Sequence, residues 1–359
     1  MFTTEIIPHT LRFKQPAGTS RGVYSEHRVW YVLLRDTADP SHYGIGECAP
    51  LPNLSCDDAA GYAETLAAFC RIAEKEQRVD TGLLRSYPSI LFGLETAMRH
   101  YQQRSWRLWE SPFSRGEEGI TINGLIWMGD YNAMMQQIES VLARGFRTVK
   151  LKIGAISFDR ELELLRSIRH RYPADEVELR VDANGAFSSR DALEKLGKLA
   201  ELAIHSIEQP IQAGQWQEMA RLCASSPLPV ALDEELIGIS DPAEKRELLG
   251  AIRPHYIILK PSLHGGISGC SEWIALAGEM DIAWWITSAL ESNIGLNSIA
   301  QWCATLGNPL PQGLGTGTLY TNNIPLPLEI KGDRLWFHHE GAFPDITGGF
   351  FPDITGDLT

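Results

Sequence analysis

The chain has 359 residues, a formal net charge of −13, and 44% hydrophobic against 21% charged residues. This length predicts two domains, or one barrel with an additional domain. The acidic excess argues against nucleic-acid binding, which needs clustered Lys and Arg, and no stretch has the roughly 20 apolar residues of a membrane span. The composition therefore predicts a soluble globular protein without nucleic-acid or membrane partners.

The start of the chain and its cysteines both predict a cytoplasmic location. Residues 1–5 have neither the basic nor the apolar segment of a secretory signal. The cysteines form no C-x-x-C pair and are expected to be reduced packing residues: Cys48, Cys56, Cys70, Cys223, Cys270 and Cys303. The sequence leaves a homo-oligomeric assembly open.

Residues 1–115 have the pattern of an α+β domain. Strand-like runs lie at 5–13 and 28–34, and helical patterns lie at 57–74 and 89–104. Two segments rich in turn-forming residues, 16–22 and 46–53, predict loops that can act as mobile lids.

Residues 116–324 repeat a short apolar run that ends in a polar residue and is followed by a helical pattern. The runs lie at 120–126, 148–152, 177–182, 203–208, 228–233, 256–260 and 283–288, with a Gly-rich turn at 313–317. Eight consecutive βα units of this size predict an α/β fold, a (β/α)₈-type (TIM-like) barrel. A doubly wound sheet is the alternative, but no G-x-G-x-x-G follows the first strand.

Helix-end signals support this division into units. Asp130 is expected to cap a helix that Gly145 closes, and Pro173 should stop the helix that begins near Phe158. Ser189 offers a further N-cap.

Charged residues end several of the predicted barrel strands. Because alternate side chains of a barrel strand point inward, Lys150 and Lys152 should share the interior. Buried ammonium groups need anions nearby, and the next three strands end in Asp182, Glu208 and Asp233. We expect these five side chains to meet at the mouth of the barrel.

Three carboxylates that converge at a barrel mouth predict a divalent metal site. Such oxygen ligands suit Mg²⁺, and Mn²⁺ is a chemical substitute. Zinc is disfavoured because neither Cys nor His occupies these positions. The alternative for each carboxylate alone is that it caps the helix after its strand, but three successive strand ends flanked by lysines favour the metal.

Lys260 ends the apolar run 256–259 and lies about four strands from Lys152 around the barrel. The two amines should therefore approach the centre from opposite sides. Positive neighbours lower the pKa of a lysine, so a lysine base at neutral pH is expected. The metal would hold a substrate carboxylate and stabilise the enediolate formed when the α-proton leaves.

These residues resemble the enolase superfamily, whose sites combine a Lys or His base with Mg²⁺. The resemblance to its muconate-lactonizing subgroup rests on the K-x-K of Lys150 and Lys152, the D-x-N of Asp182 and Asn184, Glu208, the Asp233-Glu234 pair and Lys260. The mandelate-racemase subgroup would place a His at the position of Lys260. The similarity extends over nearly the whole chain, including residues 46–51, 284–292 and 313–317.

The resemblance implies a menaquinone-pathway dehydration of 2-succinyl-6-hydroxy-2,4-cyclohexadiene-1-carboxylate to o-succinylbenzoate. It implies catalytic lysines at 150, 152 and 260, where Lys152 removes the α-proton and assists departure of the hydroxyl from the same face. Lys260 would act as a cation against the delocalised intermediate. Contacts to the small-molecule carboxylate substrate are expected from Asn184, Ser262 and Ser288.

By the same resemblance, residues 1–115 form a capping domain over the barrel mouth, completed by residues 325–359, and 116–324 form the catalytic barrel. The tail repeats one six-residue sequence, FPDITG, at 343–348 and 351–356. Two short copies cannot form a solenoid, and we assign them no chemistry.

Two other functions compete with dehydration. N-acylamino acid racemisation or dipeptide epimerisation would use both lysines as acid and base. Dipeptide epimerases of this subgroup usually carry Asp-x-Asp on the last strand, where this chain has Gly315-Thr316-Gly317. A metal-binding barrel without catalysis is the other alternative, and exchange of a substrate α-proton with deuterated solvent would exclude it.

Overall fold

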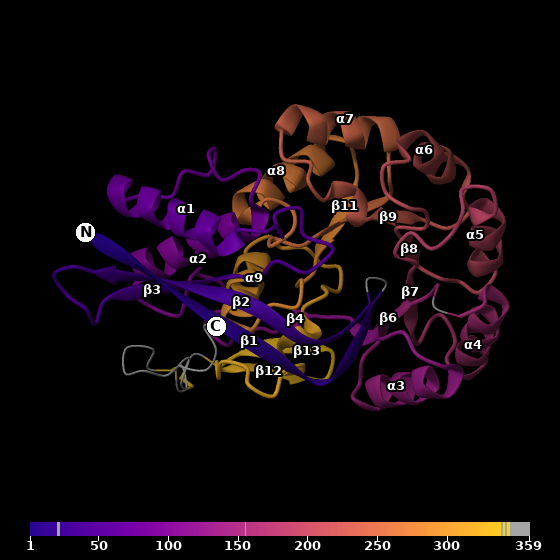
Figure 1. Cartoon of the computed structure of the whole chain (residues 1–359). Coiled ribbons are helices and arrows are strands. Elements are labelled where there is room, and N and C mark those ends of the chain that lie inside the picture. Colours follow the sequence, from indigo (N-terminus) through magenta and orange to yellow (C-terminus); the bar gives the residue numbers. More distant parts are fainter. Residues whose placement is uncertain (20–21, 155, 339, 342, 345–359) are drawn as a thin grey trace.

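The structure is a computed structural model that describes residues 1–19, 22–154, 156–338, 340–341 and 343–344. An antiparallel sheet with two helices lies beside a curled parallel sheet whose helices cover its outer face (Figure 1). No helix in the described residues is both long enough and apolar enough to span a membrane. The second copy of the repeated tail sequence and most of the first lie outside the described residues.

The N-terminal sheet has the order β1-β2-β3. Its elements are β1 (Phe2–Thr19), β2 (Gly22–Asp36) and β3 (Tyr43–Cys48), followed by α1 (Tyr62–Glu76) and α2 (Pro88–Gln103). The two predicted strands lie within β1 and β2, and the two predicted helices overlap α1 and α2. Alternation in β2 buries Val29, Tyr31 and Leu33 in one cluster and Trp30, Val32 and Leu34 in another, so the sheet is covered on both faces.

Both predicted lids are partly strand. In the first, Ala17 pairs with Tyr24, and only residues 20–21 lie outside the described chain. In the second, residues up to Cys48 belong to β3, where a Cβ on Gly46 would lie 1.9 Å from the carbonyl oxygen of Gly93 in α2. Gly46 therefore permits close packing of a helix on a strand, a tertiary role that its turn-forming character conceals.

The barrel sheet has seven parallel strands in the order β11-β10-β9-β8-β7-β6-β5. They are β5 (Gly124–Ile126), β6 (Thr148–Lys152), β7 (Glu178–Asp182), β8 (Ser206–Glu208), β9 (Val230–Leu232), β10 (Tyr256–Leu259) and β11 (Ala283–Ile286). The Gly-rich turn at 313–317, predicted as the eighth unit, contains no strand of several residues. Gln312 and Gly313 form single parallel bridges to Ile122 and Thr287, and Gly315–Thr318 is the 3-10 helix η2.

Helices alternate with these strands and lie on the outside of the curled sheet (Figure 1). They are α3 (Tyr131–Ala143), α4 (Phe158–Arg171), α5 (Ala192–Ala200), α6 (Trp216–Ser225), α7 (Pro242–Ile252), α8 (Gly266–Glu279) and α9 (Asn293–Ala304), and the 3-10 helix η1 (Glu234–Leu236) follows β9. The Asp130 cap is confirmed, because its Oδ1 accepts from the Ala133 N–H at 2.9 Å. The Ser189 cap is wrong, because α5 begins later, with Asp191 at its N-cap.

A second antiparallel sheet joins the C-terminal region to the start of the barrel. It has the order β12-β13-β4, with β4 (Ile120–Thr121), β12 (Leu328–Lys331) and β13 (Arg334–Phe337). The predicted first strand at 120–126 is therefore divided between β4 and β5. Just before β12 the chain also contacts β1, where the Thr321 N–H donates to the Arg12 carbonyl at 2.9 Å. The predicted domain limits near residues 115 and 325 stay predictions.

Two carboxylates of the N-terminal region, the half-buried Glu95 and the buried Glu47, attach to barrel helices. Glu95 of α2 accepts from the Ile267 N–H of α8 at 2.8 Å. Glu47 of β3 accepts from the N–H groups of Ser292 and Gly295, both at 2.8 Å, and from the Ser292 hydroxyl at 2.6 Å, at the start of α9. Burial is the main cause that raises the pKa of each carboxyl to about 7. The two regions are thus joined by carboxylates at helix N-termini.

We expect Glu47→Ala to lower the free energy of unfolding by about 2–4 kcal/mol, because buried donors of Ser292 and Gly295 lose their acceptor. Urea denaturation monitored by tryptophan fluorescence measures this change. Glu76→Ala, at an exposed position near the end of α1, is the matched control and should unfold like the wild type. Equal midpoints for the Glu47 variant and the wild type would contradict a stabilising role for this contact.

Candidate active site

The parallel register brings the predicted site residues to one edge of the barrel sheet. Lys152 of β6 pairs in register with Asp182 of β7, and Asp182 pairs with Glu208 of β8. Asp233 directly follows β9, and Lys260 directly follows β10. Because carboxyl ends of parallel strands meet at one edge, residues far apart in sequence become neighbours.

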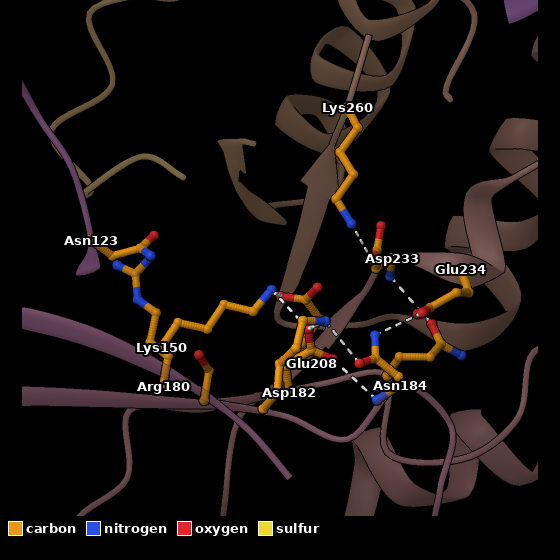
Figure 2. Close-up of polar contacts among 12 residues, drawn as sticks. Asn123, Lys150, Arg180, Asp182, Asn184, Glu208, Asp233, Glu234 and Lys260 are labelled. Atoms are coloured by element: carbon orange, nitrogen blue, oxygen red, sulfur yellow. Dashed lines mark hydrogen bonds and ion pairs between the residues drawn. The ribbon is translucent and has the colours of Figure 1, made fainter. Parts of the chain in front are cut away.

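Ion pairs connect these side chains in the barrel interior. The Lys150 Nζ lies 2.9 Å from Asp182 Oδ2 and 2.5 Å from Glu208 Oε2. The Lys152 Nζ lies 3.2 Å from Asp182 Oδ2. Lys260 forms an ion pair with Asp233 from the other side of the site (Figure 2). The predicted lysines and carboxylates therefore form one buried charged cluster.

Asn184 extends this cluster towards β9. Its Oδ1 accepts from the Lys152 ammonium group at 2.9 Å, and its Nδ2 donates to Glu234 Oε1 at 2.9 Å (Figure 2). Its own N–H donates to Asp182 Oδ1 at 3.0 Å. The D-x-N motif thus places the Asn184 amide between Lys152 and Glu234.

The charges in the cluster oppose the cost of burial. Burial lowers the pKa of Lys150, but Asp182 and Glu208 raise it more, and the net shift of its pKa is upward. The pKa of Lys260 also rises, since Asp233 and Glu208 outweigh its burial. Burial raises the pKa of Asp182, whereas Lys150 and Lys152 lower it, and the net shift is downward. With these carboxylates as their nearest partners, Lys150 and Lys260 have raised pKa values, and the lowered pKa expected of a lysine base beside a divalent cation stays a prediction.

The carboxylates retain oxygen atoms that could bind a metal. Within the described part of the chain, Glu208 Oε1, Asp233 Oδ1 and Glu234 Oε2 are buried without a hydrogen-bond partner. As the described side chains stand, no three of the His, Cys, Asp and Glu groups are arranged to hold an ion, and lysines contact the carboxylates instead. The residues nevertheless fit Mg²⁺ in chemistry, since the free donors are hard carboxylate oxygens that are costly to leave unpaired.

A cavity of about 570 Å³ lies over the lysines. Its barrel side includes Lys150, Lys152, Asn184, Lys260 and Ser288, and its N-terminal side includes Gln15, Tyr24, Leu51 and Leu54. This volume is in the range of small-molecule sites, which combine apolar walls with a few polar groups. The arrangement can therefore enclose a small anionic ligand against three lysines.

The two predicted serine contacts differ in position. Ser288 lines the cavity, and its Oγ lies 2.6 Å from the Thr316 Oγ1. Ser262 is not among the described residues that line the cavity, and its hydroxyl donates to Glu291 Oε1 at 2.5 Å. Contacts of these serines with substrate stay predictions, with Ser262 directed away from the cavity.

Sequence reasoning missed Gln209, which orients the loop after β9. Its Oε1 accepts from the N–H groups of Asp233 and Glu235, both at 3.2 Å, and its Nε2 donates to Glu235 Oε2 at 3.0 Å. The available signal was its position directly after Glu208, at the same edge of the sheet. Gln209 thus fixes the backbone that presents Asp233.

Comparisons with known proteins agree with this geometry. A family model described as enolase C-terminal domain-like matches residues 133–338. The chain is 46% identical over 358 residues to an o-succinylbenzoate synthase of Desulfotalea psychrophila, covering 90% of this chain and 96% of the relative. It is 24% identical to a hydrophobic dipeptide epimerase of Roseobacter litoralis, covering 90% of this chain and 96% of that protein. The crystal structure of MenC from Desulfotalea psychrophila matches with a TM-score of 0.81 and 40% identity, covering 93% of this chain and 99% of that chain.

The barrel, its N-terminal antiparallel sheet and the matched family model define an enolase-superfamily protein. The predicted fold class is confirmed. Within the superfamily, the chain belongs to the o-succinylbenzoate synthase family. The predicted resemblance is therefore confirmed, whereas the roles of individual residues and the metal stay predictions.

Proposed function

We propose that this protein catalyses the Mg²⁺-dependent syn dehydration of 2-succinyl-6-hydroxy-2,4-cyclohexadiene-1-carboxylate to o-succinylbenzoate, as a carbon–oxygen lyase. The observation that carries the proposal is the placement of Lys152 and Lys260, four strands apart in the sheet, on the wall of one cavity above buried carboxylates. The identity of 46% to an o-succinylbenzoate synthase supports the choice of substrate.

Lys152 carries the proton in this reaction. In its neutral form the amine takes the α-proton, and the electron pair of the broken C–H bond is delocalised over the carboxylate and the ring. This pair then forms the new ring double bond as the C–O bond breaks. The ammonium group of Lys152 then returns the proton to the departing hydroxyl on the same face, which yields water and the aromatic product. Asp182 and Asn184 contact the Lys152 Nζ at 3.2 and 2.9 Å and hold the amine at the cavity wall.

Asp182, Glu208 and Asp233 would hold Mg²⁺, with Mn²⁺ as a chemical substitute. When bound, the ion supplies positive charge that stabilises the substrate carboxylate while its α-carbon loses the proton. Lys150 contributes by bridging Asp182 and Glu208, which keeps the two carboxylates of neighbouring strands together.

Lys260 provides positive charge on the other side of the cavity. Burial opposes its charge, but Asp233 and Glu208 keep its pKa raised, which favours the ammonium form. A cation at this position stabilises negative charge that spreads over the ring as the proton leaves. Lys260 therefore needs only its charge and its position, without transferring a proton.

Lys260→Arg is expected to retain at least about a tenth of the dehydration rate, whereas Lys260→Ala should lose about 10²–10³-fold, because arginine keeps the charge. Steady-state rates with the succinyl-cyclohexadiene substrate measure both variants. Equal loss of dehydration in the two variants would contradict a role limited to charge.

The proposal also covers the setting of the reaction. We place it in menaquinone biosynthesis and in the cytoplasm, and a homo-oligomeric assembly stays open. Racemisation and epimerisation are not favoured by the relationships, and Gly315-Thr316-Gly317 lies where an epimerase of this subgroup would need acidic residues. Gly315 and Thr316 line the cavity, so this difference lies at the proposed substrate.

A further inference from the structure

Two loops from different regions of the chain form part of the cavity wall. Leu51 and Leu54 come from the segment after β3, and Ala289 and Leu290 come from the segment between β11 and α9. His27 of β2 lies behind both loops, with 2% of its surface exposed, and it is not among the described residues that line the cavity. It therefore contacts the loops without facing the proposed substrate.

Both ring nitrogens of His27 contact backbone carbonyl oxygens. The Nδ1 lies 3.1 Å from the Leu290 oxygen, and the Nε2 lies 3.1 Å from the Pro50 oxygen. Carbonyl oxygens only accept, so a neutral ring donates to one of them and an imidazolium donates to both. The neutral ring, which burial favours by lowering the pKa of His27, therefore hydrogen-bonds one segment and packs against the carbonyl oxygen of the other.

Leu290 has a backbone conformation that needs such support. Its φ is 65°, in the left-handed region that branched side chains rarely adopt. Its carbonyl oxygen also accepts from the Tyr320 hydroxyl at 2.6 Å. His27 and Tyr320 thus hold the same strained peptide, and its direction sets where Leu290 meets the cavity.

The neighbouring residues of this loop are held in a similar way. Glu291 Oε2 accepts from the Ala289 N–H at 2.7 Å, and Glu47 accepts from the N–H of Ser292 at 2.8 Å. These contacts fix the two ends of the loop, but they do not reach the segment after β3. Leu51, Ala289 and Leu290 also belong to one buried apolar cluster, and His27 adds to this packing a side chain that contacts a backbone carbonyl of each segment.

We propose that His27 is a positioning residue that fixes the two cavity loops against each other and so sets the affinity for substrate. This inference rests on the proposed dehydration for its kinetic readout. Lys152 and Lys260 come from other strands, and the ring nitrogens of His27 contact Leu290 and Pro50. The rate of the proton step should therefore change little.

The test compares His27→Gln with His100→Gln. His100 is also a buried imidazole of the N-terminal region, but it accepts from the Ile45 N–H at 3.3 Å and contacts neither cavity loop through a hydrogen bond among the described residues. We expect His27→Gln to raise KM about tenfold, the effect of one net hydrogen bond, and to change kcat by less than about threefold. His100→Gln should leave KM unchanged even where it lowers stability.

Tyr320→Phe provides a second variant that removes a donor from the same Leu290 carbonyl. It should also raise KM, and the double variant with His27→Gln should deviate from the product of the single effects, because both act on one peptide. A KM equal to the wild type in both single variants, or a fall in kcat alone, would overturn the proposal.

Amide hydrogen exchange tests the same idea without catalysis. Exchange in residues 51–54 and 288–292 should be faster in His27→Gln than in the wild type and unchanged in His100→Gln. Unchanged exchange in His27→Gln would overturn the positioning role. A wild type without dehydration activity would instead overturn the proposed function, while the exchange comparison would still test His27.

Discussion

Lys152→Ala is expected to lower the dehydration rate by about 10³-fold or more, since the side chain both removes the proton and returns it to the leaving hydroxyl. Lys152 lines the cavity, and its Nζ is 3.2 Å from Asp182 Oδ2 and 2.9 Å from Asn184 Oδ1. Lys150 remains paired with Asp182 and Glu208 in this variant, so the strand ends keep most of their ion pairs. The loss should therefore appear in kcat at nearly unchanged stability.

Steady-state kinetics and thermal unfolding of the same preparations separate chemistry from folding. Lys198→Ala is the matched control, because Lys198 lies on the outer helix α5 and pairs with Glu194 at the surface. It should keep the wild-type rate. Lys152→Ala with a rate within about tenfold of the wild type would exclude Lys152 as the proton carrier.

Asp182→Asn is expected to abolish measurable dehydration, because one carboxylate serves both lysines of β6 and the proposed metal. Its Oδ2 lies 2.9 Å from the Lys150 Nζ and 3.2 Å from the Lys152 Nζ. Asparagine keeps the shape but removes the charge, so two ammonium groups lose their shared partner. Metal affinity should fall by more than the 10–100-fold that follows loss of a group orienting a metal ligand.

Titration with Mn²⁺, followed by electron paramagnetic resonance, measures metal affinity independently of activity. Asp191→Asn is the control, because Asp191, the N-cap residue of α5, pairs with Lys195, and neither is among the described residues that line the cavity. That variant should bind the ion and react like the wild type. Unchanged Mn²⁺ affinity in Asp182→Asn would show that Asp182 is not a ligand.

The sequence predicted the barrel best where apolar runs end in charged residues. The strand at 148–152 has the predicted bounds, and the carboxylates of the next strands meet it in the predicted order. Inward alternation and parallel register are local consequences of strand geometry, so the pairing of Lys152 with Asp182 could be derived. The positions of the lysines and carboxylates could be predicted from the repeat alone, without knowledge of long-range contacts.

Other features depend on tertiary contacts that a pattern does not contain. Gly46 reads as a turn residue, yet it belongs to β3, because α2 packs where its Cβ would be. Residues 313–317 lack the apolar run of a strand. Single bridges at Gln312 and Gly313 connect this part of the chain to Ile122 and Thr287. The raised pKa values of Lys150 and Lys260 depend on their distances to several carboxylates, which the sequence does not contain.

The link between the two regions was also hidden from sequence. The contacts of His27 and Glu47 with residues 290–295 span more than 240 positions, and no local pattern around either residue indicates these partners. Buried polar groups need hydrogen-bond partners, but a sequence pattern does not show which distant residues provide them. Such contacts shape the cavity, whereas the motifs place its charges.

The most direct test of the central claim is the rate of conversion of 2-succinyl-6-hydroxy-2,4-cyclohexadiene-1-carboxylate to o-succinylbenzoate, followed by absorbance, with Mg²⁺ and after chelation. The proposed site predicts turnover at about 1–10³ s⁻¹ with Mg²⁺. It also predicts loss of activity with chelator and recovery when Mg²⁺ is restored. No conversion by folded protein with Mg²⁺, or full activity in excess chelator, would contradict the proposed Mg²⁺-dependent dehydration.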